Sequence, residues 1–523
     1  MQSGSHLQVL IPLFLVGIAC LIPLINLKRP GLSQTIALMA VTISLIASAS
    51  LFMRILNTPA GYLDYFLGYS WNGDTLLAGS QPIGIVQRTD IFGGIMLMMV
   101  NGIGLLVAIY SGEYIPHEID KKRIVYYYTA LLLMLAGMSG ITLTGDAFNF
   151  YVFLEVATIS SYILVAIPAD KKSLEASYKY MLMGALGSIL VVFGIVLLFS
   201  ATGTLNMAYA ASQIEKIMTA PEGSSLANLK QLVYASVGLF TIGFGIKSAF
   251  FPTHAWLADA HPAAPSSISA LLSGLVVKTT GIFLLIRFLF SVFNIHKYPY
   301  GDLLKIIFLV VATVTTIGGS LFAIAQKDLK RMLAYSTISQ MGYILIGIGF
   351  VTPIGLSAAI LQMVNHAVSK SLLFLCAGAL IWKTGIRDIH KMGQIGHKMP
   401  LTMTCFTIGA MSLVGVPPLS GFMSKWALAE AAMDADRMIM VGVLLLSSLL
   451  GAIYYFRVVG IAFFGPVDEA AEAETVTESV GKSEIPLTMA LPLVILASGT
   501  VYLGIKVGMM EQLISRAVHL LWL

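Results

Sequence analysis

Long apolar runs recur from one end of the chain to the other, and they limit the possible folds more than any other feature. A helix that crosses a bilayer needs about 20 mostly apolar residues, because its backbone polar groups must be satisfied within the segment. These runs predict an all-α polytopic membrane protein with about 14 transmembrane helices. The predicted segments are residues 9–27, 35–53, 91–110, 125–143, 147–167, 178–200, 232–251, 266–290, 303–325, 332–350, 354–382, 401–432, 438–464 and 485–505.

The composition excludes several classes of protein. Only 11% of the 523 residues are charged, against about 25% in soluble domains, so the chain could not cover a soluble surface. The net charge of +5 is spread over 31 Lys and Arg and forms no basic block that would bind nucleic acid. Cys20, Cys376 and Cys405 lie in apolar segments without metal-ligand spacing. We therefore expect no cofactor and no metal in this chain.

The charges of the loops predict the orientation. Lys and Arg are more numerous after the odd-numbered segments, as in Lys121, Lys122 and Arg123, than on the opposite side. Because basic loops stay in the cytoplasm, we expect a multi-pass protein of the cell membrane with both termini outside. Of the outer loops, 57–90 contains the turn-rich GYSWNGD and predicts a small hairpin, and 201–231 predicts a surface loop or short interfacial helix. The acidic inner loop 468–484 predicts a flexible linker.

Several ionisable residues lie inside the apolar segments, where each costs several kcal/mol and is a functional hypothesis by default. Glu155 sits in the middle of its segment without a charged neighbour in sequence, and Lys247 is the natural partner from another helix. A lysine keeps its proton beside a carboxylate and can lose it when the carboxylate moves away. The pair is therefore either a switchable proton site or a static pair that fixes helix register.

Prolines interrupt the seventh and twelfth segments. Pro252 stands between Lys247 and His254, and Pro417 and Pro418 precede Lys425. Proline removes a backbone donor, so both helices should break near the middle of the membrane. Broken helices at matching positions indicate an ion site between inverted repeats. The predicted units are residues 1–123 with three helices and the outer hairpin, five-helix repeats 124–293 and 294–465, and 466–523 with the last helix and a C-terminal interfacial helix.

Further titratable residues extend this set. His366 and Lys370 are four residues apart and share one helix face. A histidine titrates near neutral pH and can relay protons, although a lone buried histidine is more often a packing residue. With Lys278 and Lys425, they would complete a polar line across the protein in the membrane plane, beginning at Glu155 and Lys247.

Other charges allow structural explanations. Arg287 and Arg457 lie toward segment ends and either reach the interface or hold structure. Asp146 precedes the fifth helix, where a carboxylate favours the helix dipole. Asp259 and His261 flank the inner end of the seventh segment, where proton gating and helix capping are equally consistent with the sequence.

Four stretches resemble the antiporter-like subunits of respiratory complexes. They are FNFYVFLEVATISSYILV, IKSAFFPTHAWLADAHPAAPSSISALLSGLVVK, KDLKRMLAYSTISQMGYILIGIG and VPPLSGFMSKWAL, in the order typical of that family. Such subunits occur in complex I, in Mrp-type cation/proton antiporters and in membrane-bound hydrogenase complexes. The resemblance covers roughly residues 90 to 465, and its wording is most similar to the D-type subunit of Mrp antiporters.

The resemblance implies a function and partners. It implies a proton path through Glu155, Lys247, Lys278, His366, Lys370 and Lys425, in a complex with other integral membrane subunits. We add His254, beside the first proline break, to the expected path. A redox-driven pump and a Mrp-type antiporter both fit, and a structural scaffold without its own ion path is the alternative. Redox chemistry would belong to partner subunits, since the chain contains no P-loop, haem ligand set or nucleophile triad.

Overall fold

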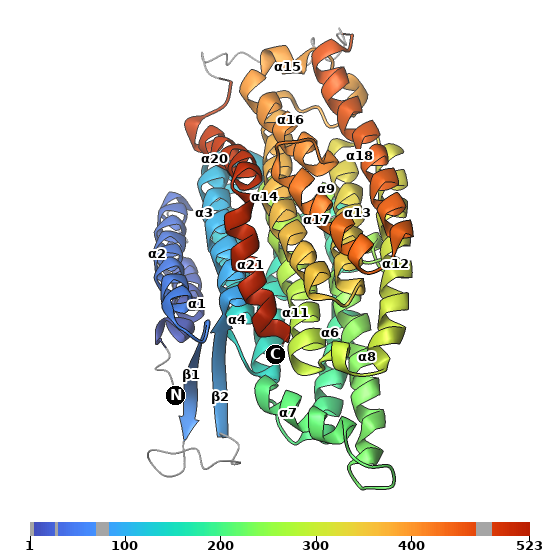
Figure 1. Cartoon of the computed structure of the whole chain (residues 1–523). Coiled ribbons are helices and arrows are strands. Elements are labelled where there is room, and N and C mark those ends of the chain that lie inside the picture. Colours follow the sequence, from blue (N-terminus) through green and yellow to red (C-terminus); the bar gives the residue numbers. More distant parts are fainter. Residues whose placement is uncertain (1–4, 27–29, 70–82, 467–483, 523) are drawn as a thin grey trace.

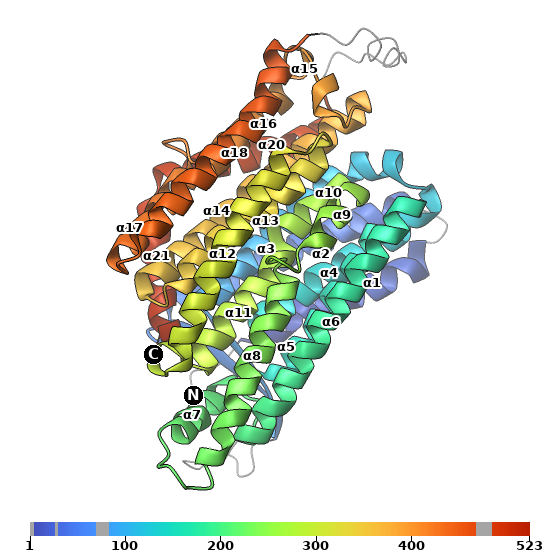
Figure 2. The same cartoon turned by 90° about the vertical axis from the view of Figure 1, so that its right-hand side faces the viewer.

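The computed structural model describes residues 5–26, 30–69, 83–466 and 484–522. It is a bundle of long helices with one two-stranded hairpin (Figures 1 and 2). Thirteen segments in the described part of the chain are long and apolar enough to cross a membrane, which confirms the predicted all-α polytopic architecture. They comprise α1 (Leu7–Asn26), α2 (Pro30–Asn57), α3 (Ile91–Glu118), α4 (Ile124–Leu143), α5 (Ala147–Ala166), α6 (Lys171–Thr202), α8 (Lys230–Lys247), α12 (Tyr300–Ile324), α13 (Leu329–Gly349), α14 (Pro353–Thr384), α18 (Met438–Phe464), α20 (Leu487–Ile505) and the segment Ser266–Val292.

The predicted segment 401–432 is absent from these thirteen because it is divided into two short helices. They are α16 (Pro400–Val414) and α17 (Ser420–Asp434), and Pro417 and Pro418 lie between them. Gly415 ends α16 in the left-handed region at φ +95°, a conformation that glycine adopts without a steric cost.

The predicted segment 232–251 also ends early. Helix α8 stops at Lys247, and the chain resumes as α9 (Ala255–Ala263) after a turn that contains Pro252. The indole Nε1 of Trp256 in α9 donates to the carbonyl of Ile246 at 3.1 Å. A side chain of the second half-helix thus satisfies a carbonyl at the end of the first, as buried backbone requires.

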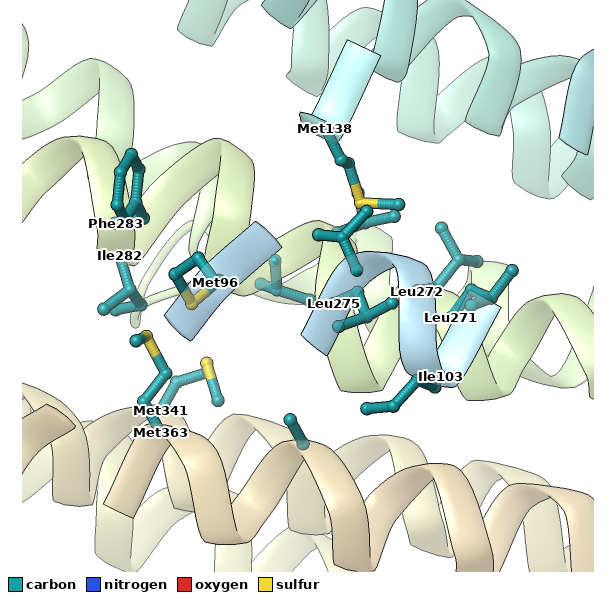
Figure 3. Packing of buried hydrophobic residues seen from close by; sticks show 14 of the residues in the cluster. Met96, Ile103, Met138, Leu271, Leu272, Leu275, Ile282, Phe283, Met341 and Met363 are labelled. Atoms are coloured by element: carbon teal, nitrogen blue, oxygen red, sulfur yellow. The ribbon is translucent and has the colours of Figure 1, made fainter. Parts of the chain in front are cut away.

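The segment Ser266–Val292 is wound more widely than an α-helix. It runs through α10 (Ser266–Leu271), the π-helical turns η3 (Leu272–Val276) and η4 (Lys278–Phe283), α11 (Leu284–Ile286) and the π-helical η5 (Arg287–Val292). Turns of this kind are rare and often occur at functional sites. The segment lies in the middle of the core, where Figure 3 shows its side chains beside those of Met96, Ile103, Met138, Met341 and Met363.

The two ends of the bundle differ in character. The hairpin end carries the antiparallel strands β1 (Tyr62–Tyr69) and β2 (Ile83–Asp90), with α7 (Met207–Met218), η2 (Ala227–Leu229) and η6 (Ile295–Lys297) (Figure 1). The basic end carries η1 (Lys121–Arg123), η7 (Ile389–Lys391) and α15 (Ile395–Lys398). The predicted hairpin and the short helix in loop 201–231 are therefore present. Residues 70–82, which hold most of the turn-rich GYSWNGD, and the acidic stretch 467–483 lie outside the described residues.

Both described ends of the chain lie at the hairpin end (Figure 1). Near the N-terminus, the side-chain amide of Gln8 donates to the carbonyl of Leu63 in β1 at 3.0 Å. The last helix, α21 (Val507–Trp522), packs on α14 and α3 of its own chain, and the ring of Trp522 stacks on His296 at 4.3 Å. Four residues of this helix are thus buried within the chain, namely Ile514, Ala517, Val518 and Leu521. Its predicted place at the membrane interface stays a prediction.

A buried ion pair joins the hairpin to the core. The guanidinium of Arg287 in η5 binds both carboxylate oxygens of Asp90, and Arg287 Nη2 lies 2.8 Å from Asp90 Oδ1. The two side chains are only 12% and 7% exposed. Asp90 also caps α3 by accepting from the amide of Gly93 at 2.8 Å. Of the two explanations open for Arg287, the structure therefore supports the structural one.

Breaking this pair should destabilise the protein. Asp90→Asn keeps a side chain that can cap α3 but leaves Arg287 without its counter-charge, which typically costs about 3–5 kcal/mol. We expect a clearly lower thermal unfolding temperature for the detergent-solubilised protein.

Asp64→Asn is the matched control for this prediction. The Arg88–Asp64 pair of the hairpin has the same chemistry but is 37% and 35% exposed, so its loss should cost no more than about 1 kcal/mol. Equal effects of the two variants would show that the buried pair has no special role.

The same pair predicts a pH dependence. Burial tends to raise the pKa of the Asp90 carboxyl, but the Arg287 guanidinium, the Gly93 amide and Arg88 together outweigh burial and hold that pKa below the usual 3.8. The contribution of the pair is therefore complete above the unfolded-state pKa and is lost as the pH falls through the folded-state pKa. Between pH 5 and pH 2, wild type should lose more stability than Asp90→Asn. Parallel curves would contradict this assignment.

Candidate functional site

A series of six ionisable side chains lies within the bundle, on five different helical elements. Glu155 is on α5, Lys247 ends α8, Lys278 begins η4, His366 and Lys370 are on α14, and Lys425 is on α17. Lys247 is 3% exposed, and Lys278, His366 and Lys370 are completely buried. Burying so many titratable groups is costly, so their arrangement calls for a functional explanation.

Glu155 and Lys247 interact at a distance. The carboxylate acts electrostatically on the ammonium, but the two form no ion pair within 4 Å among the described residues. Glu155 Oε1 and Lys247 Nζ are both buried without a hydrogen-bond partner in the described chain. The predicted partners therefore interact without direct contact, and within the described residues no hydrogen bond or ion pair holds either charge in place.

The break after Lys247 is packed directly against the element that carries Lys278. Gly281, three residues beyond Lys278, lies so close to Ser248 that a Cβ at Gly281 would stand 2.2 Å from the Ser248 hydroxyl. The ammonium of Lys278 donates to the carbonyl of Ser273. Because this acceptor is five residues earlier in the chain, the wide turns of η3 and η4 supply the oxygen that the lysine binds.

His366 and Lys370 lie on the other side of the same element. A Cβ at Gly274 would stand 2.2 Å from the hydroxyl of Ser371 on α14, so η3 and α14 are in close contact. Lys370 Nζ donates to the carbonyl of Leu333 at 2.8 Å and to the hydroxyl of Ser336. Neither ring nitrogen of His366 has a hydrogen-bond partner within the described ranges. Lys278 and Lys370 both act on this ring electrostatically.

Lys425 marks the far end of the series. Its ammonium donates to the carbonyl of Val414, the last residue of α16, and to the hydroxyl of Ser448 on α18, each at 2.9 Å. It also lies 4.7 Å from the centre of the Tyr343 ring. The lysine thus satisfies a carbonyl that is left free where the helix breaks, just before Pro417 and Pro418.

His254 lies at the first break but not on the buried series. Its ring stacks on Phe251 at 4.9 Å and on Phe322 at 6.3 Å, and the side chain is only partly buried. Its Nδ1 atom has no hydrogen-bond partner among the residues that the structure describes. The structure therefore places His254 at the edge of the bundle, between the end of α8 and the start of α9.

Two buried residues of this region were missed or underrated in the sequence. Lys330 stands in a basic loop motif, but it is 1% exposed and donates to the carbonyl of Ala264. His261 is completely buried, and Lys278, Lys330 and Lys370 all act on it electrostatically. The position of Lys330 on the first turn of an apolar transmembrane helix could have indicated that it is buried. No sequence feature distinguishes His261 from a histidine that caps a helix.

Two further charged residues noted in the sequence, Asp146 and Arg457, have ordinary structural roles. Asp146 caps α5 by accepting from the amides of Phe148 and Asn149 at 2.9 and 2.8 Å, as predicted from its position. Arg457 donates to the carbonyls of Ile324 and Gln326, each at 2.7 Å, at the end of α12.

An amide on α14 holds the second break together. Asn365 Oδ1 lies 2.6 Å from the hydroxyl of Ser420 on α17, 3.1 Å from that of Ser412 on α16 and 3.3 Å from that of Ser369. All four residues are buried. Asn365 is next to His366, so the same turn of α14 positions the histidine and both halves of the broken helix.

The described residues contain no group of three or more His, Cys, Asp or Glu side chains that could hold a metal ion. The expectation of a chain without its own metal or cofactor stays a prediction.

The chain is similar to known membrane subunits over most of its length. A family model described as "NADH:quinone oxidoreductase/Mrp antiporter, TM" matches residues 144–451. The N-type subunit of the NADH-quinone oxidoreductase of Desulforudis audaxviator is 34% identical over 84% of this chain and 85% of its own length. The D-type subunit of the Na⁺/H⁺ antiporter of Alkalihalophilus pseudofirmus is 35% identical over 83% of both chains.

A solved structure agrees with the fold over nearly the whole chain. A subunit of the membrane-bound sulfane sulfur reductase, an archaeal respiratory membrane complex, superposes with a TM-score of 0.85 at 27% identity. The match covers 99% of this chain and 98% of that one. It includes the N-terminal helices and the C-terminal region, which lie beyond the residues of the family match.

Removing the amide at the second break should loosen it. Asn365→Ala deprives the surrounding hydroxyls of their shared acceptor, at about 1 kcal/mol for each hydrogen bond lost. We expect a lower thermal unfolding temperature together with reduced transport. Ser369→Ala, which removes one donor and leaves the acceptor, is the control and should retain more of both; equal losses would contradict a central role for the amide.

Proposed function

The chain belongs to the NADH:quinone oxidoreductase/Mrp antiporter transmembrane family, and from this premise we propose that Glu155, Lys247, Lys278, His366, Lys370 and Lys425 carry protons across its centre. The chain is a proton-translocating, multi-pass subunit of a multisubunit membrane complex. One observation carries the assignment of residues. Four completely or almost completely buried titratable groups, Lys247, Lys278, His366 and Lys370, have no carboxylate in contact within the described residues.

The absence of fixed ion pairs is what a moving proton requires. A lysine in contact with a carboxylate keeps its proton, whereas one held by carbonyls and hydroxyls in a dry interior can release it. Lys278 and Lys370 are held by a carbonyl, and Lys370 also by a hydroxyl. The site can therefore change its charge without first breaking a buried salt bridge, a step that would cost about 3–5 kcal/mol.

Charge changes would pass along the series from one member to the next. When Lys247 is protonated, its interaction with Glu155 favours that state, and its positive charge disfavours a second one on Lys278. A neutral Lys278 in turn lets the pair of Lys370 and His366 take up a proton. The added positive charge then makes Lys425 more ready to release its proton. Alternating occupancy of this kind follows from like-charge repulsion in a low-dielectric interior.

We place the basic end in the cytoplasm. The loops with many Lys and Arg gather there, and this follows the general bias of cytoplasmic loops. Both termini, which lie at the hairpin end, would then face outward from a cell membrane. Pro252, Pro417 and Pro418 mark the breaks at which water would reach the buried series from the two sides. His254 would stand at the first of these.

Two kinds of complex can contain such a subunit. The relatives include a subunit of an NADH-quinone oxidoreductase and a subunit of a Na⁺/H⁺ antiporter. The wording of the sequence motifs favours an antiporter subunit of the D type. The sodium path would then lie elsewhere, because the described residues offer no cluster of ligands for a metal ion. The alternative is a pump module driven by redox partners.

Purification of the intact complex in a mild detergent distinguishes the two. We expect a metal-free assembly of small membrane subunits, identified by mass spectrometry and metal analysis, that exchanges sodium for protons in proteoliposomes. Iron, nickel or flavin in stoichiometric amounts would instead assign the chain to a redox-driven pump.

The buried lysines should be essential for transport. Lys278→Met preserves most of the side-chain volume but removes the proton carrier, so the complex should assemble and proton transport in proteoliposomes should be abolished. Lys216→Met, on the exposed face of α7, is the control and should transport like wild type. Wild-type transport by the Lys278→Met complex would refute the proposed path. If the Glu155→Gln complex also transported protons like wild type, a static role for Glu155 would be favoured.

A further inference from the structure

A charged cavity opens at the basic end of the bundle. Its volume is about 500 Å³, enough for several water molecules, since each occupies about 30 Å³ in the liquid. Its walls come from the ends of α3, α6, α9 and α13, and they carry Glu118, Asp259, Asp328 and Arg387. Asp259 does not cap a helix; it pairs with Lys179 at 3.2 Å and with Arg331 at 3.5 Å.

Lys330 connects this cavity to the interior. It stands on the first turn of α13, is 1% exposed, and donates to the carbonyl of Ala264 at the end of α9. Glu118, Asp328 and Arg387, which all line the cavity, act on its ammonium electrostatically. The lysine is therefore covered by protein but close to the charges around the water-accessible space.

His261 continues from Lys330 toward the centre. On α9, Asp259, Pro262 and Ala263 line the cavity, whereas His261 falls on the opposite face by the helical period. Its ring stacks on Phe374 of α14 at 4.8 Å. In the described chain, neither ring nitrogen has a hydrogen-bond partner. Three lysines act on it electrostatically, namely Lys330 on the cavity side and Lys278 and Lys370 on the central side.

An imidazole in this position is unusual as a purely structural group. Buried polar atoms are normally hydrogen-bonded, and each exception needs an explanation. His261 has two such atoms, and no carboxylate is in contact with it among the described residues. It also acts electrostatically on His366, a member of the central series. A ring with two free nitrogens between cationic groups is suited to accept a proton on one side and release it on the other.

We propose that Lys330 and His261 form a proton-access relay that joins the cavity at the basic end to Lys278, His366 and Lys370. This rests on the proposed function and adds two residues and a route to it. Lys330 Nζ passes a proton, directly or through water, to one ring nitrogen of His261. The other ring nitrogen releases a proton to a neutral Lys278 or Lys370, and water in the cavity returns a proton to Lys330. Each group of the relay ends with its original charge.

The first test uses Lys330→Arg in the intact complex, assayed in proteoliposomes. Arginine retains the positive charge and the ability to donate to Ala264, but it does not release its proton in proteins. We expect normal assembly and a loss of proton transport of tenfold or more. Lys327→Arg, at an exposed position in the preceding loop, is the matched control and should transport like wild type. Wild-type transport by Lys330→Arg would overturn the relay.

The second test uses His261→Ala with chemical rescue. Removing the ring leaves space of its own size near the cavity, so imidazole added to the buffer should restore part of the lost transport. Pyrazole, a ring of the same size that does not accept protons near neutral pH, should not. His296→Ala is the control, because that histidine also stacks on an aromatic ring, Trp522, and lacks hydrogen-bond partners among the described residues, but it lies at the hairpin end.

The outcomes separate this inference from the proposed function. If Lys278→Met abolishes transport while His261→Ala and Lys330→Arg transport normally, the relay is overturned and the central path remains. If Lys278→Met also transports normally, the proposed function itself fails. An assembled His261→Ala complex that is inactive and is rescued by neither ring assigns a structural role to His261 and overturns its place in the relay.

Discussion

The fold depends on how positive charges are accommodated where no negative charge touches them. Lys278 and Lys370 are completely buried and bind carbonyl and hydroxyl oxygens rather than carboxylates. A regular helix has no free carbonyls in its interior, because each accepts the amide four residues later. Irregular backbone supplies such an oxygen to Lys278, in the wide turns at η3 and η4. Lys370 instead shares the carbonyl of Leu333 within the regular helix α13 and also binds the hydroxyl of Ser336.

The two breaks meet the same requirement with different side chains. At the first, the indole of Trp256 donates to the carbonyl of Ile246. At the second, the ammonium of Lys425 donates to the carbonyl of Val414. In each case a residue of the following half-helix satisfies an oxygen of the preceding one. The difference has a consequence for function: the acceptor at the second break binds a proposed proton carrier, so the geometry of that break and the charge of Lys425 are coupled.

The sequence is sufficient to predict the helices, because crossing a membrane imposes a length and a composition on each segment. It also identifies the positions of the breaks, since proline cannot continue a helix, and the buried charges, since their cost singles them out. It does not reveal which groups meet. Lys330 follows an exposed loop, and only the packing of α13 against the end of α9 shows that it points inward. The π-helical turns have no comparable sequence signal, and the separation of Glu155 from Lys247 depends on the positions of α5 and α8.

Paired and unpaired buried charges occupy different parts of the molecule. At the hairpin end, Asp90 and Arg287 form a buried bidentate pair that joins the hairpin to the core. Such a pair gives a single, lasting geometry, because breaking it leaves an unpaired charge inside the protein. In the centre, the lysines and histidines lack this kind of partner within the described residues. A protein that only needed rigidity would pair its central charges as it pairs those of the hairpin. The proposed proton path accounts for leaving them unpaired, because a charge that changes during transport must not be held by a permanent partner.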